Sequence, residues 1–193
     1  MATKQIRKCG KGKSALPATE QQMSRGFMYE FYHRYRFIAP GLKCAGGNEM
    51  DVIGIRRSGM VDEIEIKTTR GDFLADFKKT TIVRSQPEIP DFLKTAPERM
   101  DKHLAVAAGM ALCNYFAFLM PPSLAEQCES EIPEHAGLYT FTPNLFYGKI
   151  ETIKKARMLH RGKIPTPEEN RYLRAVSWRY VSMLIDIKTE GTE

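Results

Sequence analysis

Apolar side chains recur along this chain with two different periods, which predict helices in some segments and strands in others. In residues 19–37 they return every three or four positions, as on the buried face of a helix. Thr19 and Gln22 match a capping box at the start of this helix, and a Pro-Gly pair at 40–41 is expected to end the element. Residues 50–68 instead alternate with a period of two around an Arg-Ser-Gly turn, which predicts a β-hairpin.

The rest of the chain continues this mixture of patterns. Further helices are predicted at 70–79, 101–112 and 166–187, and further strands at 115–120, 136–141 and 145–153. Prolines in residues 80–97 predict a loop or an insertion near 80–100. Aromatic residues recur at helical spacing in the last helix and are expected to join the core. We therefore expect one α/β domain at 18–193, with a mixed central β-sheet flanked by helices and a C-terminal helix.

Residues 104–122 are nearly free of charge and about as long as a membrane span. Asn114 interrupts this stretch, and two prolines close it at 121–122. Its first half is rich in Ala, Leu and Met and its second half is aromatic, which favours a buried helix followed by a buried strand. We therefore expect no association with a membrane.

The charge balance suits a polyanionic partner. Lysine and arginine outnumber acidic residues by 29 to 23, a modest excess that nucleic-acid-binding proteins share with many unrelated proteins. Residues 1–17 are basic and lack apolar periodicity, which predicts a disordered tail and leaves open an arm that contacts phosphate. The four cysteines form no CxxC pair and no signal peptide is recognised, which favours a cytoplasmic protein with reduced thiols, buried at Cys44 and Cys113.

The predicted hairpin carries unusual charges for an element that the core must cover. Glu65 and Lys67 project from one face of its second strand, and Asp51 can lie beside them across the strand pair. Two carboxylates and an ammonium group are costly to bury unless they are paired or bind a metal. Mg²⁺ or Mn²⁺ held by Asp51, Glu65 and the carbonyl of Ile66 is one solution, with Lys67 stabilising negative charge or orienting a water in phosphodiester hydrolysis. The alternative is the solvated polar face of an ordinary surface hairpin.

Three stretches resemble known nucleases. Asp51 followed by "EIEIK" resembles the motif of the PD-(D/E)xK nuclease superfamily, and "RGFMYE" resembles the opening helix of archaeal Holliday-junction resolvases. The stretch "EIKTTRGDFLADFKK" is similar to one in MmcB-like DNA repair proteins, and "DKH", "YFAFLMP" and "IPEHAGLY" follow in that family's order. The resemblance implies a restriction-endonuclease-like core, and it implies that Glu30 joins Asp51 and Glu65 at the metal.

Several further polar residues are secondary candidates. Hydroxyls and cations directly after the second hairpin strand could hold phosphates beside the scissile bond, or could be an ordinary exposed helix start. These residues are Thr68, Thr69, Arg70, Lys78 and Lys79. Glu63 is expected to be a solvated charge at a strand end, with an outer metal ligand as the alternative. His103 is expected to be a helix cap or surface residue, with a catalytic role as the alternative.

These features predict a Mg²⁺- or Mn²⁺-dependent deoxyribonuclease, either an endonuclease or a DNA repair nuclease. DNA is the expected partner, and a homodimer or complexes with repair or recombination proteins would suit such an enzyme. Two other functions stay open: a non-cleaving DNA-binding or recombination accessory that keeps the fold, and, with less support, a small-molecule or RNA enzyme that uses the same carboxylates.

Overall fold

A computed structural model describes residues 18–43, 49–83 and 99–190. The predicted basic tail at 1–17, Cys44 and most of the predicted insertion at 80–100 lie outside these residues. The chain divides into two compact units, Met1–Lys163 and Ile164–Glu193. The C-terminal helix α5 (Thr166–Glu190) belongs to the second unit, and the elements below belong to the first.

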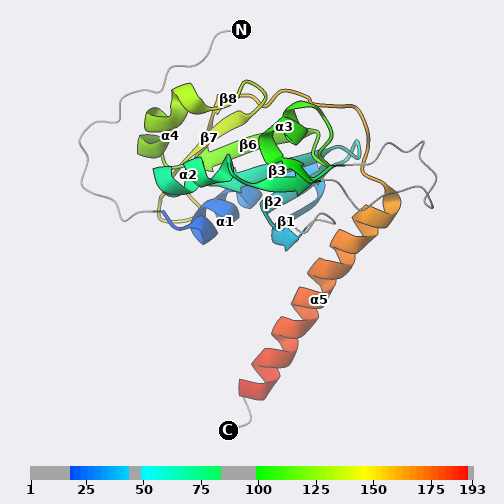
Figure 1. Cartoon of the computed structure of the whole chain (residues 1–193). Helices are drawn as coiled ribbons and strands as arrows, with labels where there is room; N and C mark the ends of the chain where they lie inside the picture. The colour runs from blue at the N-terminus through cyan, green and yellow to red at the C-terminus, as the bar shows by residue number, and fades with distance from the viewer. Residues whose placement is uncertain (1–17, 44–48, 84–98, 191–193) are drawn as a thin grey trace, which may run out of the picture. The chain divides into compact units, whose positions relative to one another are not determined.

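The first unit is built on a six-stranded mixed sheet with the strand order β1-β2-β3-β6-β7-β8 (Figure 1). Its strands are β1 (Tyr35–Lys43), β2 (Glu49–Arg56), β3 (Val61–Ile66), β6 (Tyr115–Met120), β7 (Gly137–Thr142) and β8 (Lys149–Lys154). Strands β1, β2 and β3 form an antiparallel meander, β3, β6 and β7 are parallel, and β8 returns antiparallel to β7. This arrangement confirms the predicted α/β fold with a mixed central sheet.

Helices flank the sheet on both sides, with α1 on one side and α2 and α4 on the other (Figure 1). They are α1 (Glu20–Phe31), α2 (Arg70–Asp76), α3 (Lys102–Ala107) and α4 (Pro122–Cys128), with the 3₁₀ turns η1 (Tyr32–Arg34) and η3 (Glu129–Glu131). A small antiparallel pair, β4 (Thr80–Ile82) and β5 (Arg99–Asp101), precedes α3.

The predicted start of α1 is confirmed, and so is its buried face. Thr19 and Gln22 form both hydrogen bonds of the capping box. Phe27 is 1% exposed and packs in one core cluster with Ile64 and Leu119 of the central strands. The inward face of β3 that carries Ile64 is therefore the face that α1 covers.

The predicted helix ends earlier than expected, because a strand replaces its second half. Helix α1 stops at Phe31, and β1 begins at Tyr35 and continues through the Pro-Gly pair that was expected to end a helix. Pro40 is tolerated because β1 lies at the edge of the sheet, where one side of the strand needs no donor. Gly41 adopts a φ of 53°, a left-handed conformation that glycine accepts at little cost.

The predictions for α3 and for the aromatic residues of α5 need correction, whereas the prediction for the charge-poor stretch 104–122 is confirmed. Helix α3 ends at Ala107 rather than residue 112, because Gly109 has a φ of 70° and its amide donates a hydrogen bond to the Val106 carbonyl. Of the aromatic residues in α5, Tyr172 is fully buried as predicted, whereas Trp178 and Tyr180 are 71% and 62% exposed and are not core residues. The charge-poor stretch 104–122 separates into a helix and the buried strand β6, as predicted. Among the described residues, no helix is both long and apolar enough to cross a membrane.

Candidate active site

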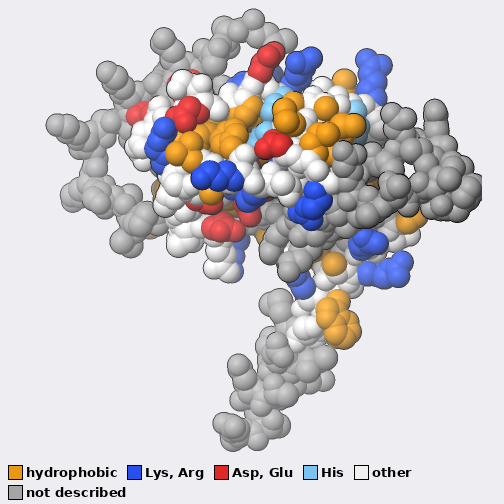
Figure 2. All heavy atoms as spheres, in the orientation of Figure 1, with side chains coloured by type: hydrophobic (Ala, Val, Ile, Leu, Met, Phe, Trp, Pro, Cys, Tyr) orange, Lys and Arg blue, Asp and Glu red, His pale blue; other side chains and the backbone are white. Residues whose placement is uncertain are grey.

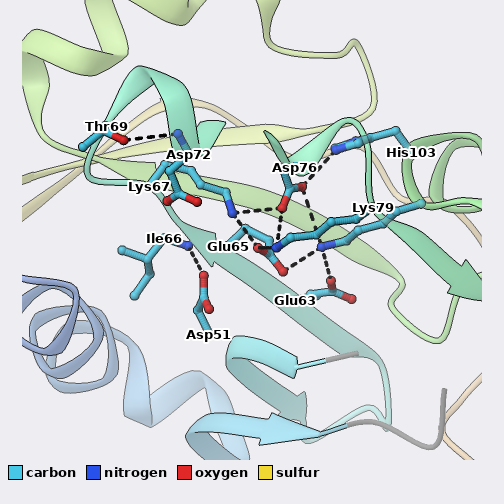
Figure 3. Close-up of polar contacts among 11 residues, drawn as sticks. Asp51, Glu63, Glu65, Ile66, Lys67, Thr69, Asp72, Asp76, Lys79 and His103 are labelled. Atoms are coloured by element: carbon cyan, nitrogen blue, oxygen red, sulfur yellow. Dashed lines mark hydrogen bonds and ion pairs between the residues drawn. The ribbon is translucent and has the colours of Figure 1, made fainter. Parts of the chain in front are cut away.

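Asp51 and Glu65 meet where the pairing of β2 with β3 ends. The last register pair in this direction joins Val52 to Ile64, and Asp51 lies one position beyond it. Beyond this pair a side chain accepts the hydrogen bond of a strand amide: Asp51 Oδ2 accepts from the Ile66 amide at 2.7 Å (Figure 3). The amide and carbonyl of one residue in an extended strand point to the same side, so the Ile66 carbonyl is also directed towards β2.

The half-buried Asp51 carboxyl is held in an unfavourable environment for its charge. Burial and the negative charge of Glu65 raise its pKa to about 7, against the opposing effects of the Ile66 amide and Lys67. Glu20, the first residue of α1, adds a further negative charge. Near neutral pH this carboxyl is therefore divided between its protonated and ionised forms, and a nearby cation would favour the ionised form.

Replacing Asp51 by asparagine should stabilise the metal-free protein at pH 8. Asparagine keeps an oxygen for the Ile66 amide and removes a charge whose folded-state pKa is raised. A carboxyl whose pKa is raised in the folded state destabilises the protein at a pH where it is ionised in both the folded and the unfolded state. Asp51→Asn should therefore raise the free energy of unfolding by about 1–2 kcal/mol at pH 8, and this increase should shrink as the pH falls from about 7 to 4. Urea unfolding in EDTA at a series of pH values measures this difference in the free energy of unfolding. A variant less stable than wild type at pH 8 would contradict this account.

Glu65 is the centre of a larger network, which we call the ion-pair cluster (Figure 3). It comprises three carboxylates and three ammonium groups: Glu63, Glu65, Asp76, Lys67, Lys79 and Lys102. Glu65 Oε2 lies 2.8 Å from the Nζ of Lys67 and 3.2 Å from that of Lys79, and Oε1 lies 2.6 Å from Lys102. The equal numbers of charges explain how a fully buried glutamate stays ionised.

Asp76 of α2 is the second hub of the cluster. Its Oδ1 lies 2.9 Å from Lys67 and 2.7 Å from Lys79, and its Oδ2 lies 3.0 Å from Nε2 of His103. The Lys67 ammonium is therefore fixed between Glu65 and Asp76, with only 2% of its side chain exposed. The predicted placement of Lys67 beside Glu65 is confirmed, and Asp76 is an additional partner.

The pKa values in the cluster shift in the directions that strong pairing requires. Burial by itself would lower the pKa of Lys67, but Glu65 and Asp76 raise it above its ordinary value. Burial would likewise raise the pKa of Glu65, but Lys102, Lys67 and Lys79 lower it. Lys67 is consequently a permanent cation near neutral pH, which suits charge stabilisation and excludes proton abstraction.

Two residues that were expected to be solvated or on the surface are buried in or beside the ion-pair cluster. Glu63 is 8% exposed and lies 3.1 Å from Lys102, the first residue of α3. His103 is also buried, bonds to Asp76 and stacks on Phe77 with ring centroids 4.4 Å apart. The cap of α3 is Asp101, whose carboxylate accepts from the Leu104 amide at 2.9 Å.

Asp76 and Lys102 were not among the sequence-based candidates. A signal for Asp76 exists, because it follows Phe73 by three positions in α2 and so shares that residue's buried face. For Lys102 the clue is only its place in "DKH", next to the buried His103. Nothing in the local pattern indicates that this lysine reaches strand β3.

The predicted metal role of Glu30 stays a prediction, and a second acidic residue of α1 acts on Asp51. Glu30 is exposed in the last turn of α1, ten residues after Glu20 and so about 15 Å further along the helix axis. The negative charge of Glu20 contributes to the raised pKa of Asp51. Glu20 is therefore a further candidate for the α1 position of the metal site.

The predicted phosphate-contacting residues have mixed surroundings. Thr68 and Lys78 are exposed, and Lys79, at 45% side-chain exposure, belongs to the ion-pair cluster. Thr69 Oγ1 caps α2 through the Asp72 amide, and Arg70 pairs with Glu131 at 2.7 Å. The face seen in Figure 2 carries lysine and arginine side chains with acidic side chains between them, rather than one continuous basic stripe.

The donor set fits Mg²⁺ or Mn²⁺ with few protein ligands. Asp51, Glu65 and the Ile66 carbonyl supply oxygens only, as these cations prefer, and such ions commonly use one or two carboxylates together with substrate phosphates. The negative potential that raises the pKa of Asp51 would be relieved by a cation. Within 18–43, 49–83 and 99–190, however, no group of three or more His, Cys, Asp or Glu side chains is placed to hold a metal ion.

Comparisons with known proteins add support for the fold. No protein-family model matches the chain, and no curated protein is significantly similar to it. The chain is similar to the solved structure of a protein of unknown function from Silicibacter pomeroyi, with a TM-score of 0.56 and 15% sequence identity. The similarity covers 94% of this chain and 97% of that one, and at this identity it shows a shared fold and nothing of activity.

Proposed function

We propose that this protein is a Mg²⁺- or Mn²⁺-dependent DNA endonuclease or DNA repair nuclease with a restriction-endonuclease-like core. The observation that supports this most is the meeting of Asp51, Glu65 and Lys67 where β2 and β3 stop pairing. The resemblance to PD-(D/E)xK and MmcB-like proteins rests on the same residues. An ordinary solvated hairpin face does not account for them, because Glu65 and Lys67 are buried.

Each residue then has a distinct role. Asp51, Glu65 and the Ile66 carbonyl would hold the metal, with Glu20 close enough to strengthen the negative potential. The bound ion would polarise the scissile phosphate and lower the pKa of a water. Lys67 presents a fixed ammonium group to the negative charge that develops on phosphate, and Asp76 positions it.

A second candidate is a non-cleaving DNA-binding or recombination and repair accessory protein. One observation favours it: both oxygens of Glu65 are already within 3.2 Å of lysine ammonium groups. A cation would have to compete with Lys102 and Lys79 for this carboxylate. A protein that no longer cleaves could keep the cluster for stability alone.

A panel of end-labelled DNAs separates these functions. Duplex, nicked, single-stranded and four-way-junction DNA are each incubated with the protein in Mg²⁺, Mn²⁺ or EDTA, with Glu65→Gln as the inactive control. Products that require metal and are absent with the variant support the nuclease. DNA binding with no product in either metal supports the accessory protein, and neither binding nor cleavage of any DNA would reject both proposals.

Glu20→Gln and Glu30→Gln form a matched pair that tests the α1 position. Glu20 adds to the negative potential at Asp51, so Glu20→Gln should raise the Mn²⁺ concentration needed for half-maximal cleavage several-fold. Glu30→Gln changes an exposed residue and should leave this concentration unchanged. Metal titrations of cleavage rate measure both variants, and the opposite result would favour Glu30 for the α1 position.

A further inference from the structure

A cavity of about 360 Å³ lies on the other face of the sheet from the ion-pair cluster. Side chains alternate along β3, so Asp62 and Ile64 line this cavity while Glu63 and Glu65 point to the opposite face. The cavity is thus separated from the candidate active site by the sheet itself. Its volume falls within the range of small-molecule sites, roughly 300–1,000 Å³.

Arg56 is fixed in the wall of this cavity by an aromatic ring and a carboxylate. Its guanidinium lies 3.7 Å from the centroid of the Tyr115 ring, and its Nη2 donates to Asp62 Oδ2 at 3.0 Å. The Tyr35 hydroxyl donates to the same oxygen at 2.7 Å. The three residues therefore form a rigid, preorganised polar wall.

The Asp62 carboxylate belongs to this wall and is not open to a ligand. Its side chain is only 8% exposed, and its Oδ1 is buried 2.9 Å from Arg56 Nε in an ion pair. A ligand in the cavity would therefore contact the cations and rings around this pair rather than the carboxylate itself.

Two further cations line the same cavity from different elements. They are Arg34 of η1 and Lys155, which follows β8, and both are exposed. Neither forms an ion pair with a residue in the part of the chain that the structure describes, although Arg34 lies 4.2 Å from the centroid of the Phe31 ring. An anion held by both would not need to displace an internal carboxylate.

The remaining lining is apolar or aromatic. Ile64, Ala117 and Ala156 provide small aliphatic surfaces, and Tyr115 and Tyr139 provide rings. Tyr139 is held in place by the edge-on ring of Phe27, with centroids 5.4 Å apart. A flat apolar ring system could pack on this surface, as nucleic-acid bases do on tyrosine rings.

We propose that this cavity binds a nucleotide, with its phosphate at Arg34 and Lys155 and its base against the tyrosines. The combination favours a nucleotide over inorganic phosphate, which would leave the tyrosine rings without a contact. It also favours a nucleotide over an uncharged ring compound, which would leave both cations unused. The nucleotide is either free in solution or the 5′-phosphorylated end of a DNA strand, since both present the same groups.

Calorimetric titrations in EDTA test the proposal with AMP, dAMP, adenosine, inorganic phosphate and a single-stranded oligonucleotide with or without a 5′-phosphate. The absence of metal makes the result independent of whether the protein cleaves DNA. We expect saturable nucleotide binding, at least tenfold tighter for AMP or dAMP than for adenosine or inorganic phosphate. If only the oligonucleotide binds, and only when 5′-phosphorylated, the strand end is the source of the nucleotide.

Three variants assign any binding to this cavity. The double variant Arg34→Gln/Lys155→Gln changes exposed residues and should weaken nucleotide binding at least tenfold, and Thr152→Phe should block the cavity. Lys149→Gln removes an exposed cation of β8 outside the cavity and should bind as wild type does. No saturable binding of any nucleotide, equal binding of inorganic phosphate, or undiminished binding in the double variant would overturn the proposal.

Discussion

Lys67→Met should reduce metal-dependent DNA cleavage by about 10²- to 10³-fold while leaving DNA affinity and the fold intact. The magnitude is that of removing one preorganised charge-stabilising donor from an active site. Lys67 is suited to this role because Glu65 and Asp76 fix its ammonium at 2.8 and 2.9 Å and keep it protonated. Its contribution is therefore to the transition state more than to binding.

The fold should survive this change because each carboxylate keeps another cation. Glu65 retains Lys102 at 2.6 Å, and Asp76 retains Lys79 at 2.7 Å. Methionine also fills a similar volume in the buried position. Single-turnover cleavage and gel-shift titrations are the measurements, with the exposed Lys78→Met as control. A wild-type cleavage rate in Lys67→Met would reject the proposed role of this residue.

Asp76→Asn should lower the free energy of unfolding by about 3 kcal/mol, the lower end of the cost of breaking a buried ion pair from one side. Asp76 is fully buried and accepts from Lys67, Lys79 and His103. Removing its charge leaves Lys67 with one carboxylate instead of two. For a chain of this length the midpoint of thermal unfolding should fall by about 6–12 °C.

Asp72→Asn is the matched control, because Asp72 lies in the same helix but is exposed. Removing the Asp72 charge should lower the free energy of unfolding by at most about 1 kcal/mol, through its interaction with the dipole of α2. The ion pairs lower the pKa of Asp76 far below its ordinary value, so its stabilising effect is complete above the unfolded-state pKa of about 4. Wild type should lose this stability only as the pH falls below that value, so the difference between wild type and variant should narrow in acid. Equal stability of wild type and Asp76→Asn at pH 7 would show that the cluster does not stabilise the fold.

The hairpin and its charges could be predicted because their signals are local. Alternation in 50–68 sets which residues share a face, and the short turn sets which residues lie opposite one another. That is enough to bring Asp51 beside Glu65. The capping box of α1 is local in the same sense, since its two hydrogen bonds join residues three apart.

The parts that sequence reasoning missed depend on tertiary contacts. Tyr35 fits the helical spacing of Phe27 and Phe31, but it is the first residue of strand β1. Its hydroxyl donates to Asp62, which lies 27 residues later in the chain, so the contact that holds it has no local signal. Lys102 reaches Glu65 across 37 residues. The effect of Glu20 on Asp51 likewise depends on how α1 lies against the sheet, which the pattern within the helix does not indicate.

The hydrogen bond from the Ile66 amide to Asp51 has a spectroscopic consequence. This amide is bound to a carboxylate oxygen rather than to a main-chain carbonyl, so its proton senses the charge state of Asp51 directly. In a ¹H–¹⁵N spectrum the Ile66 cross-peak should move with an apparent pKa of about 7 in the metal-free protein. A cation bound at Asp51 should abolish that titration near neutral pH, which makes one backbone resonance an indicator of both protonation and metal occupancy.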